Sequence, residues 1–147
     1  MLRRYTFWLT AAVLFMFLTA GLHSISFFVT PDITNETQRQ LHELLHNYRE
    51  DMGAGFNRSF FDLFTALSAC FPLLCMLGGL TLGHLLLRHA EPALMKGIIG
   101  INLAIFLVGL IVFIFFAFLP PVILTGLIVL NLALAYILCP TIESAID

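Results

Sequence analysis

Four long apolar stretches constrain this chain more than any other feature of its sequence. They run over residues 5–29, 60–87, 97–119 and 122–139. Each is close to or above the length of about 20 residues that a helix needs to cross a bilayer. Backbone groups in hydrocarbon must be hydrogen-bonded within their own segment, so we expect helices. The sequence therefore predicts an all-α integral membrane protein, a four-helix bundle that forms a single transmembrane domain over residues 1–147.

The composition also indicates that lipid surrounds much of the chain. Hydrophobic residues make up 60% of the 147 residues and charged residues only 11%, whereas soluble domains have about 45–50% and about 25%. A soluble fold of this size could not bury so much apolar surface in one core. The net charge of −2 also offers no basic surface for nucleic acid. We therefore expect the lipid bilayer as a partner and no nucleic acid.

The basic residues favour one orientation in the membrane. Lysines and arginines are enriched on the cytoplasmic side, and the first helix carries most weight. Four bases lie on the side of the N-terminus and three lie in the connection between the first two stretches: Arg3, Arg4, Arg88 and Lys96 against Arg39, Arg49 and Arg58. We expect both termini inside. The first stretch is longer than the apolar core of a signal peptide, so we expect it to be retained.

Residues 30–59 form the one long polar segment, and part of it has helical periodicity. Apolar residues recur there on one face of a helix: Leu41, Leu44, Leu45, Tyr48 and Met52. This spacing predicts an amphipathic helix over about 34–52 that lies flat on the membrane surface. Thr34 is the expected N-cap, and Gly53 and Gly55 are expected to end the helix.

The same segment contains His42-Glu43-Leu44-Leu45-His46, a match to the His-Glu-x-x-His pattern. Histidines four residues apart share a helix face and can hold one zinc ion, with Glu43 as the general base. The alternative is two interfacial side chains at the edge of an amphipathic helix. A short motif with two free positions favours this second interpretation unless the fold supplies a third ligand.

His23 is the candidate third ligand. It lies near the end of the first stretch, on the same side of the membrane as His42 and His46, so a folded-over helix could complete a zinc or copper site. An ionisable residue within a membrane helix is a functional candidate. The alternative is a neutral His23 that hydrogen-bonds to a neighbouring helix.

The start of the second stretch combines a cap with a charge pair. Ser59 and Asp62 fit a capping box ahead of an apolar run, and Arg58 is the expected counter-charge of Asp62. Capping explains an acid at the membrane edge. The alternative is a ligand site, in which Arg58 and Asp62 border a crevice for a lipid or quinone.

Small residues predict where helices approach closely. Gly79 and Gly83 form a GxxxG pair in the second stretch, and Gly100 and Ala104 have the same spacing in the third. Such pairs let two helix backbones come close together. We expect these surfaces to pack within the bundle, against a partner membrane protein, or against a second copy of the chain.

Polar residues within the stretches have structural interpretations. Asn102 and Asn131 lie at similar depth and predict an interhelical hydrogen bond. His84, Arg88 and His89 form a small cluster at the inner surface, where long polar side chains extend towards water.

The stretch from Met52 to Leu80, with Asn57-Arg58-Ser59-Phe60-Phe61-Asp62-Leu63-Phe64 at the start of the second span, resembles families of small bacterial four-span inner-membrane proteins. These are of the DoxX-like and domain-of-unknown-function type. The resemblance implies a four-helix bundle in a bacterial cytoplasmic membrane. It implies no activity.

Three function classes remain open from the sequence. The first is a non-enzymatic accessory or assembly subunit of a membrane complex. The second is a metal-binding protein or metal-dependent membrane enzyme that uses His42, His46 and His23 with Glu43. The third is a lipid or quinone binder with a crevice near Asp62. We favour the first class, because each polar residue has an adequate structural explanation. The sequence also has no phosphate-binding glycine loop and no nucleophile elbow, so we expect no cofactor, with zinc or copper as the alternative.

Overall fold

The structure of the protein is a computed structural model that describes residues 4–29 and 32–140. Its elements are α1 (Tyr5–Ile25), η1 (Ser26–Phe28), α2 (Glu36–Asn47), β1 (Arg49–Asp51), β2 (Asn57–Ser59), α3 (Phe60–Leu87), α4 (Pro92–Phe116) and α5 (Leu119–Leu138). Four helices, namely α1 continued by η1, α3, α4 and α5, are long and apolar enough to cross a membrane. The prediction of a helical protein with four such segments is confirmed. Arg3, one of the bases used for the orientation, lies outside the described residues.

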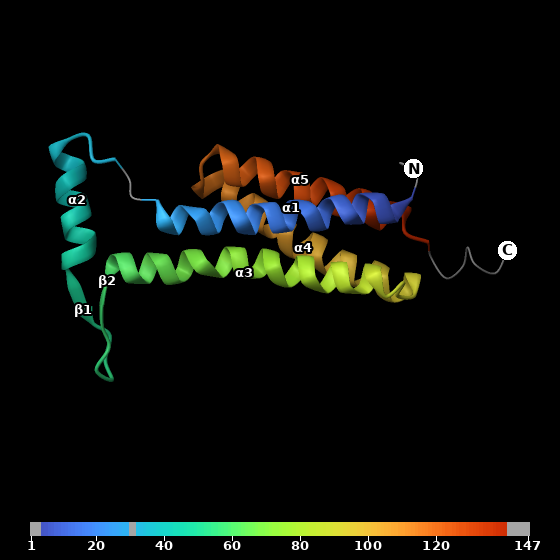
Figure 1. Cartoon of the computed structure of the whole chain (residues 1–147), viewed down its shortest axis with the longest axis horizontal. Coiled ribbons are helices and arrows are strands. Elements are labelled where there is room, and N and C mark those ends of the chain that lie inside the picture. Colours follow the sequence, from blue (N-terminus) through green and yellow to red (C-terminus); the bar gives the residue numbers. More distant parts are fainter. Residues whose placement is uncertain (1–3, 30–31, 141–147) are drawn as a thin grey trace.

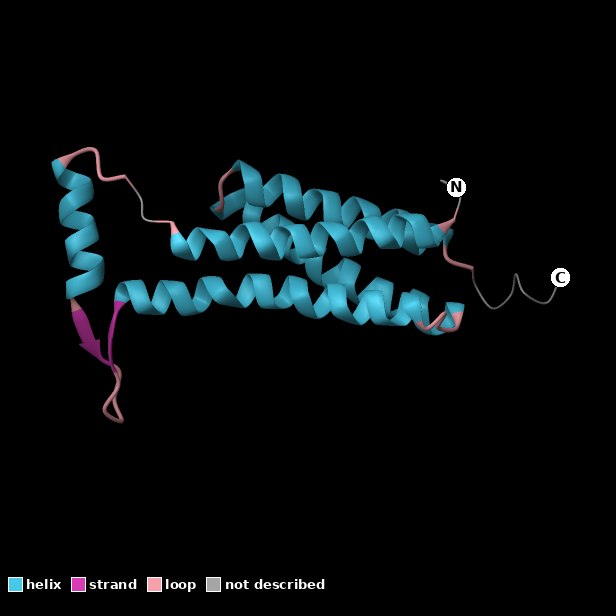
Figure 2. Ribbon diagram, viewed as in Figure 1, coloured by secondary structure: helices cyan, strands magenta, loops and turns pink. Residues whose placement is uncertain are grey.

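The four long helices lie side by side, and consecutive ones run in opposite directions (Figure 1). Helix α1 packs against both α3 and α5, and α4 packs mainly against α5. Helix α2 stands across the ends of α1 and α3, and the short hairpin β1–β2 follows it at the same end (Figure 2). The polar connection is therefore held against one end of the helices.

The core of the molecule follows α1, because this helix touches both of its neighbours. Its buried residues are Leu9, Ala12, Val13, Met16, Thr19 and Ala20, and they meet Cys75 and Leu82 of α3 and Ile128 and Leu132 of α5. Most large apolar side chains of α4, by contrast, are exposed. A soluble protein could not leave so much apolar surface open, so the exposed surface fits contact with lipid.

Helix α2 is shorter than the apolar periodicity of its sequence predicts. It ends at Asn47, and the residues up to Met52, predicted as helical, are instead extended and enter a hairpin in which Arg49 pairs with Ser59. The turn contains three successive residues with positive φ, at Gly53, Ala54 and Gly55. Glycine adopts this conformation without steric cost. The two glycines therefore form a hairpin turn, not the end of a helix.

The N-cap of α2 is Asn35, not Thr34 as predicted. The side chain of Asn35 accepts a hydrogen bond of 2.9 Å from the backbone N–H of Gln38. Thr34 is one residue further out, where its backbone N–H and hydroxyl both donate to the Gln38 side chain at 2.8 Å. Both residues can cap, but the asparagine is the one adjacent to the first helical residue.

Prolines move the boundaries of the last two membrane helices. Helix α4 begins at Pro92, before the predicted start at residue 97, and α5 begins at Leu119, so Pro120 and Pro121 lie in its first turn instead of in a separate turn. The first turn of a helix is where proline fits, because its missing N–H would have no partner there.

The predicted hydrogen bond between Asn102 and Asn131 is absent from the described residues. Each side-chain amide donates to a carbonyl of its own helix, at 2.9 Å to Ile98 and at 2.7 Å to Leu127. Bonding four residues back satisfies these groups without requiring α4 and α5 to bring the two side chains face to face.

Helix α3 ends in a Schellman motif with an unusual residue. The backbone N–H of Ala90 donates to Leu85 at 3.0 Å, and that of His89 donates to Leu86 at 3.2 Å. The position that glycine usually takes in this motif is occupied by His89, whose φ is +49°. For a residue with a Cβ, the left-handed conformation costs about 1–2 kcal/mol.

Candidate functional site

Where α2 crosses the ends of α1 and α3, the three elements enclose a crevice of about 580 Å³. We call it the histidine crevice. Helix α2 contributes His42, Leu45 and His46. The remaining walls come from η1 with the residue after it and from the first turns of α3, and consist of Ser26, Phe27, Phe28, Val29, Phe61, Phe64, Thr65 and Ser68. The lining is mostly apolar, with a few polar groups among aromatic rings.

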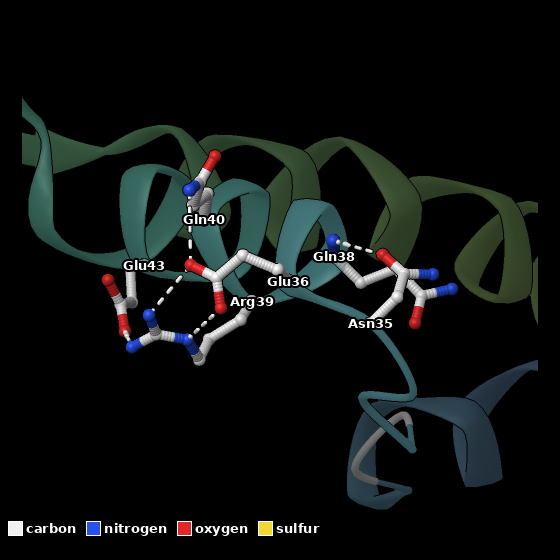
Figure 3. Close-up of polar contacts among 6 residues, drawn as sticks. All are labelled: Asn35, Glu36, Gln38, Arg39, Gln40 and Glu43. Carbon is white, nitrogen blue, oxygen red and sulfur yellow. Dashed lines mark hydrogen bonds and ion pairs between the residues drawn. The ribbon is translucent and has the colours of Figure 1, made fainter.

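Charged residues stabilise the helical form of α2 on the side that faces away from the crevice. The Arg39 guanidinium donates to both carboxylate oxygens of Glu36, at 2.7 and 2.9 Å, and to Glu43 at 3.0 Å (Figure 3). Gln40 also donates to Glu36, at 3.1 Å. The hydrogen bonds from Arg39, and then from Gln40, lower the pKa of Glu36 below its ordinary value. The bond to Glu36 and the charge of Glu43 in turn raise the pKa of Arg39.

The two histidines of the motif form a stack with Phe61. The His46 ring lies 4.0 Å from the His42 ring and 4.0 Å from the Phe61 ring, measured between centroids. The His46 Nδ1 lies 2.9 Å from the carbonyl oxygen of His42. A carbonyl only accepts, so Nδ1 carries a proton, and in the neutral ring Nε2 is then the acceptor. The three rings together give the crevice an aromatic wall.

His23 is held elsewhere by α3. Its Nε2 lies 2.9 Å from the Ser68 hydroxyl and 3.2 Å from the Ser68 carbonyl oxygen. Its ring packs edge-to-face on Phe27 and Phe71. His23 thus connects α1 and α3 by a hydrogen bond, which agrees with the interpretation that it bonds to a neighbouring helix. Among residues 4–29 and 32–140, no group of three or more His, Cys, Asp or Glu side chains is arranged to hold a metal ion.

Glu43, the predicted general base, is bound to Arg39 on the exposed side of α2. It does not line the histidine crevice. Glu43 therefore does not share the crevice with the two histidines of the motif.

Asp62 and Arg58 do not line the histidine crevice. Asp62 completes the predicted capping box, in which its backbone N–H donates to the Ser59 hydroxyl and its carboxylate accepts from the Ser59 N–H, both at 3.1 Å. Its ion-pair partner is Arg49, at 4.0 Å, whereas the predicted partner Arg58 lies over the Phe56 ring. Arg58 and Asp62 line a neighbouring hollow of about 340 Å³, which shares Phe61 and Thr65 with the histidine crevice.

The small residues lie at helix contacts or on an open face. A Cβ on Gly79 would come within 3.2 Å of Phe17, and one on Gly83 within 3.6 Å of Val13, so both face α1. Gly100 is covered by the Tyr136 ring of α5. Ala104 is exposed and lines a groove of about 910 Å³ between α4 and α5.

The sequence did not indicate Phe61, Thr65 and Ser68 as residues that line a crevice with the histidines. Their spacing of four and three residues is one face of a helix, which was a usable signal. The sequence does not show the direction in which α2 runs. In the structure the hairpin sets this direction, and it brings the Tyr48 ring onto the Phe60 ring, with centroids 5.8 Å apart.

No protein-family model matches the chain, and no curated protein and no solved structure matches it. The resemblance to small bacterial four-span proteins stays a prediction.

Proposed function

We propose that this protein is a non-enzymatic membrane protein that binds a lipid-soluble molecule with a flat polar head, of the quinone class, in the histidine crevice. The observation that carries the proposal is the ring stack of Phe61, His46 and His42 on the crevice wall. Ligand sites of this kind have volumes of about 300–1,000 Å³ and are mostly apolar with a few placed polar groups. The crevice, at about 580 Å³, has both properties.

The polar groups suit the two redox forms of a quinone. The free Nε2 of His46 accepts a hydrogen bond from a hydroquinone hydroxyl, and a ring N–H of His42 donates to a quinone carbonyl. The Thr65 hydroxyl lines the same crevice. Flat rings gain about 0.5–1.5 kcal/mol from stacking beyond their burial. A flat head therefore finds both stacking and hydrogen bonds here.

The rim of the crevice suits an apolar tail. Phe28, Val29 and Phe64 line it, and all three side chains are exposed. An apolar tail that leaves the crevice over these residues passes into lipid. The proposal differs from the crevice predicted near Asp62, because that residue lies on another hollow.

The proposal is tested by titrating the purified protein in detergent with decyl-ubiquinone. Leu45→Trp fills the crevice, and Leu44→Trp places the same side chain on the exposed part of α2. We expect saturable binding that Leu45→Trp weakens at least about tenfold and Leu44→Trp leaves unchanged. Equal effects of the two substitutions would contradict the proposal.

Metal binding is the competing proposal for the same histidines. Elemental analysis of the purified protein distinguishes the two. Stoichiometric zinc or copper that His46→Ala removes and His84→Ala retains would favour the metal proposal. Quinone binding that the first variant weakens, without bound metal, favours ours.

A role as an accessory or assembly subunit is a second candidate, and the open face of α4 favours it. Ala93, Gly97 and Ala104 line the groove between α4 and α5, and small residues let a further helix approach closely. The occupant in this candidate is a transmembrane helix of a partner subunit. Gly97→Leu should then remove a co-purifying subunit that Gly109→Leu retains, since neither glycine has a neighbour within 4 Å.

For the membrane placement, we propose a four-helix transmembrane bundle in a bacterial cytoplasmic membrane, with both termini inside and α2 as an amphipathic helix on the outer surface. The exposed side chains of Leu41 and Leu44 support contact of α2 with the membrane. Reporter fusions after residue 55 and after residue 140 test the orientation. A reporter that works only outside the cytoplasm should be active after residue 55 and inactive after residue 140. A reporter that works only inside should give the opposite result.

A further inference from the structure

A groove of about 1060 Å³ lies between α1 and α3, at the end of these helices opposite α2. Its walls are formed by Phe7, Ala11 and Leu14 of α1 and by Leu86 of α3. Arg4, just before α1, and His89, just after α3, also line it. The groove therefore combines apolar walls along the helices with basic groups at the helix ends.

The two basic groups are available to a ligand. Within the part of the chain that the structure describes, neither the Arg4 guanidinium nor the His89 imidazole has a hydrogen bond or an ion pair. Lys96, at the same end of the molecule, is already engaged, since it donates to the Cys139 carbonyl at 3.2 Å and lies over the Tyr136 ring. No residue that lines the groove is acidic.

The backbone conformation of His89 is a second reason to expect a ligand in this groove. This residue has the left-handed conformation in which glycine is least strained. Helix termination alone would favour glycine or asparagine there. A side chain that persists at a strained position is a reason to look for a function, and this one lines the groove.

We propose that this groove binds an anionic phospholipid. The phosphate lies between Arg4 and His89, and an acyl chain follows Phe7, Ala11 and Leu14 along α1. The charge complementarity of two unpaired basic groups selects an anionic head, and the length of apolar wall selects a lipid. This site does not depend on the histidine crevice.

The test uses the full chain and compares phosphatidylglycerol with phosphatidylcholine of the same acyl chains. Native mass spectrometry counts the lipids that stay bound when the protein is released from mixed micelles. We expect retention of one phosphatidylglycerol. Arg4→Gln and His89→Gly should each lower its affinity about tenfold, the scale of one charge-assisted hydrogen bond. Arg88→Gln is the matched control, because it removes a neighbouring charge that does not line the groove.

Two further readouts separate binding from folding. His89→Gly should keep or raise the thermal stability, since glycine fits the left-handed position, so lost lipid binding in this variant is not a folding defect. Ala11→Phe should block the acyl chain, whereas Leu18→Phe, on α1 outside the groove, should not. The proposal is overturned if wild-type protein shows no preference for phosphatidylglycerol, or if Arg88→Gln lowers binding as much as Arg4→Gln.

Discussion

The ring of His46 stacks on the ring of Phe61, with centroids 4.0 Å apart and an interplanar angle of 25°. This contact joins the polar connection to the first turn of a membrane helix. It closes one side of the histidine crevice, and it orients the imidazole whose Nδ1 is bound to the His42 carbonyl. The crevice therefore depends on a contact between a residue outside the apolar stretches and one within them.

The first prediction concerns this contact. Phe61→Ala removes a stack worth about 0.5–1.5 kcal/mol, so α2 should open more often while the long helices stay folded. Hydrogen exchange should be faster at α2 amides and unchanged at α1. Leu67→Ala is the control, because Leu67 is exposed on α3 and does not line the crevice. Unchanged exchange of α2 in Phe61→Ala would contradict the role of the stack.

The second prediction concerns the start of α3. Ser59→Ala removes the hydroxyl that accepts from the Asp62 N–H, and an N-cap of this type is worth about 1 kcal/mol. Thermal unfolding in detergent should show a lower Tm. Ser24→Ala, in the last turn of α1 and without a side-chain hydrogen bond among the described residues, should leave the Tm nearly unchanged. If both variants unfold at the wild-type temperature, the capping box contributes nothing to stability.

The third prediction concerns the pH dependence of α2. The pKa of Glu36 is lowered from 4.5, chiefly by the hydrogen bonds from Arg39. A lowered pKa stabilises the folded form above the unfolded pKa, and this stabilisation is lost as the pH falls through the folded pKa. Exchange at α2 amides should therefore accelerate below about pH 4.5 relative to α3.

Glu36→Gln should remove this pH dependence, because the amide does not titrate. Glu50→Gln, in β1 outside the cluster, is the control. An α2 whose protection follows the same pH curve in wild type and Glu36→Gln would show that another group is responsible.

The fourth prediction concerns close packing of α3. A Cβ on Gly78 would lie 2.8 Å from Asn102 Oδ1 and 3.3 Å from Met16 Sδ. The Asn102 side chain is held by its bond to Ile98, so it cannot move away freely. Gly78→Ala should destabilise the protein by about 1–3 kcal/mol, the usual cost of overpacking. Gly109→Ala has open space and should be neutral or stabilising. Equal Tm values for the two variants would count against this packing.

Much of the fold follows from the sequence, for reasons that particular residues illustrate. Membrane spans are predictable because hydrocarbon demands long apolar segments. The capping box is predictable because Ser59 and Asp62 interact locally. The hairpin after α2 was missed because the periodicity of Tyr48 and Met52 also fits a helix, and only the positive φ values at residues 53–55 reverse the chain.

The candidate site was predictable only in part. His42 and His46 stand out in the sequence, but their neighbours depend on how α2 lies across α1 and α3. The interpretation of His23 as a residue that hydrogen-bonds to a neighbouring helix did not name its partner, which is Ser68, 45 positions along the chain. Local motifs specify which side chains share a helix face. They do not specify which other helix that face meets.

The most direct test of the central claim is photolabelling with an azido-quinone, followed by peptide mapping of the purified protein. We predict labels concentrated on residues 42–46 and 61–68, suppressed by excess decyl-ubiquinone and lost in Leu45→Trp. Labels spread over the exposed face of α4 and unaffected by the competitor would show that the quinone only dissolves in the surrounding lipid, and would contradict a binding site in the histidine crevice.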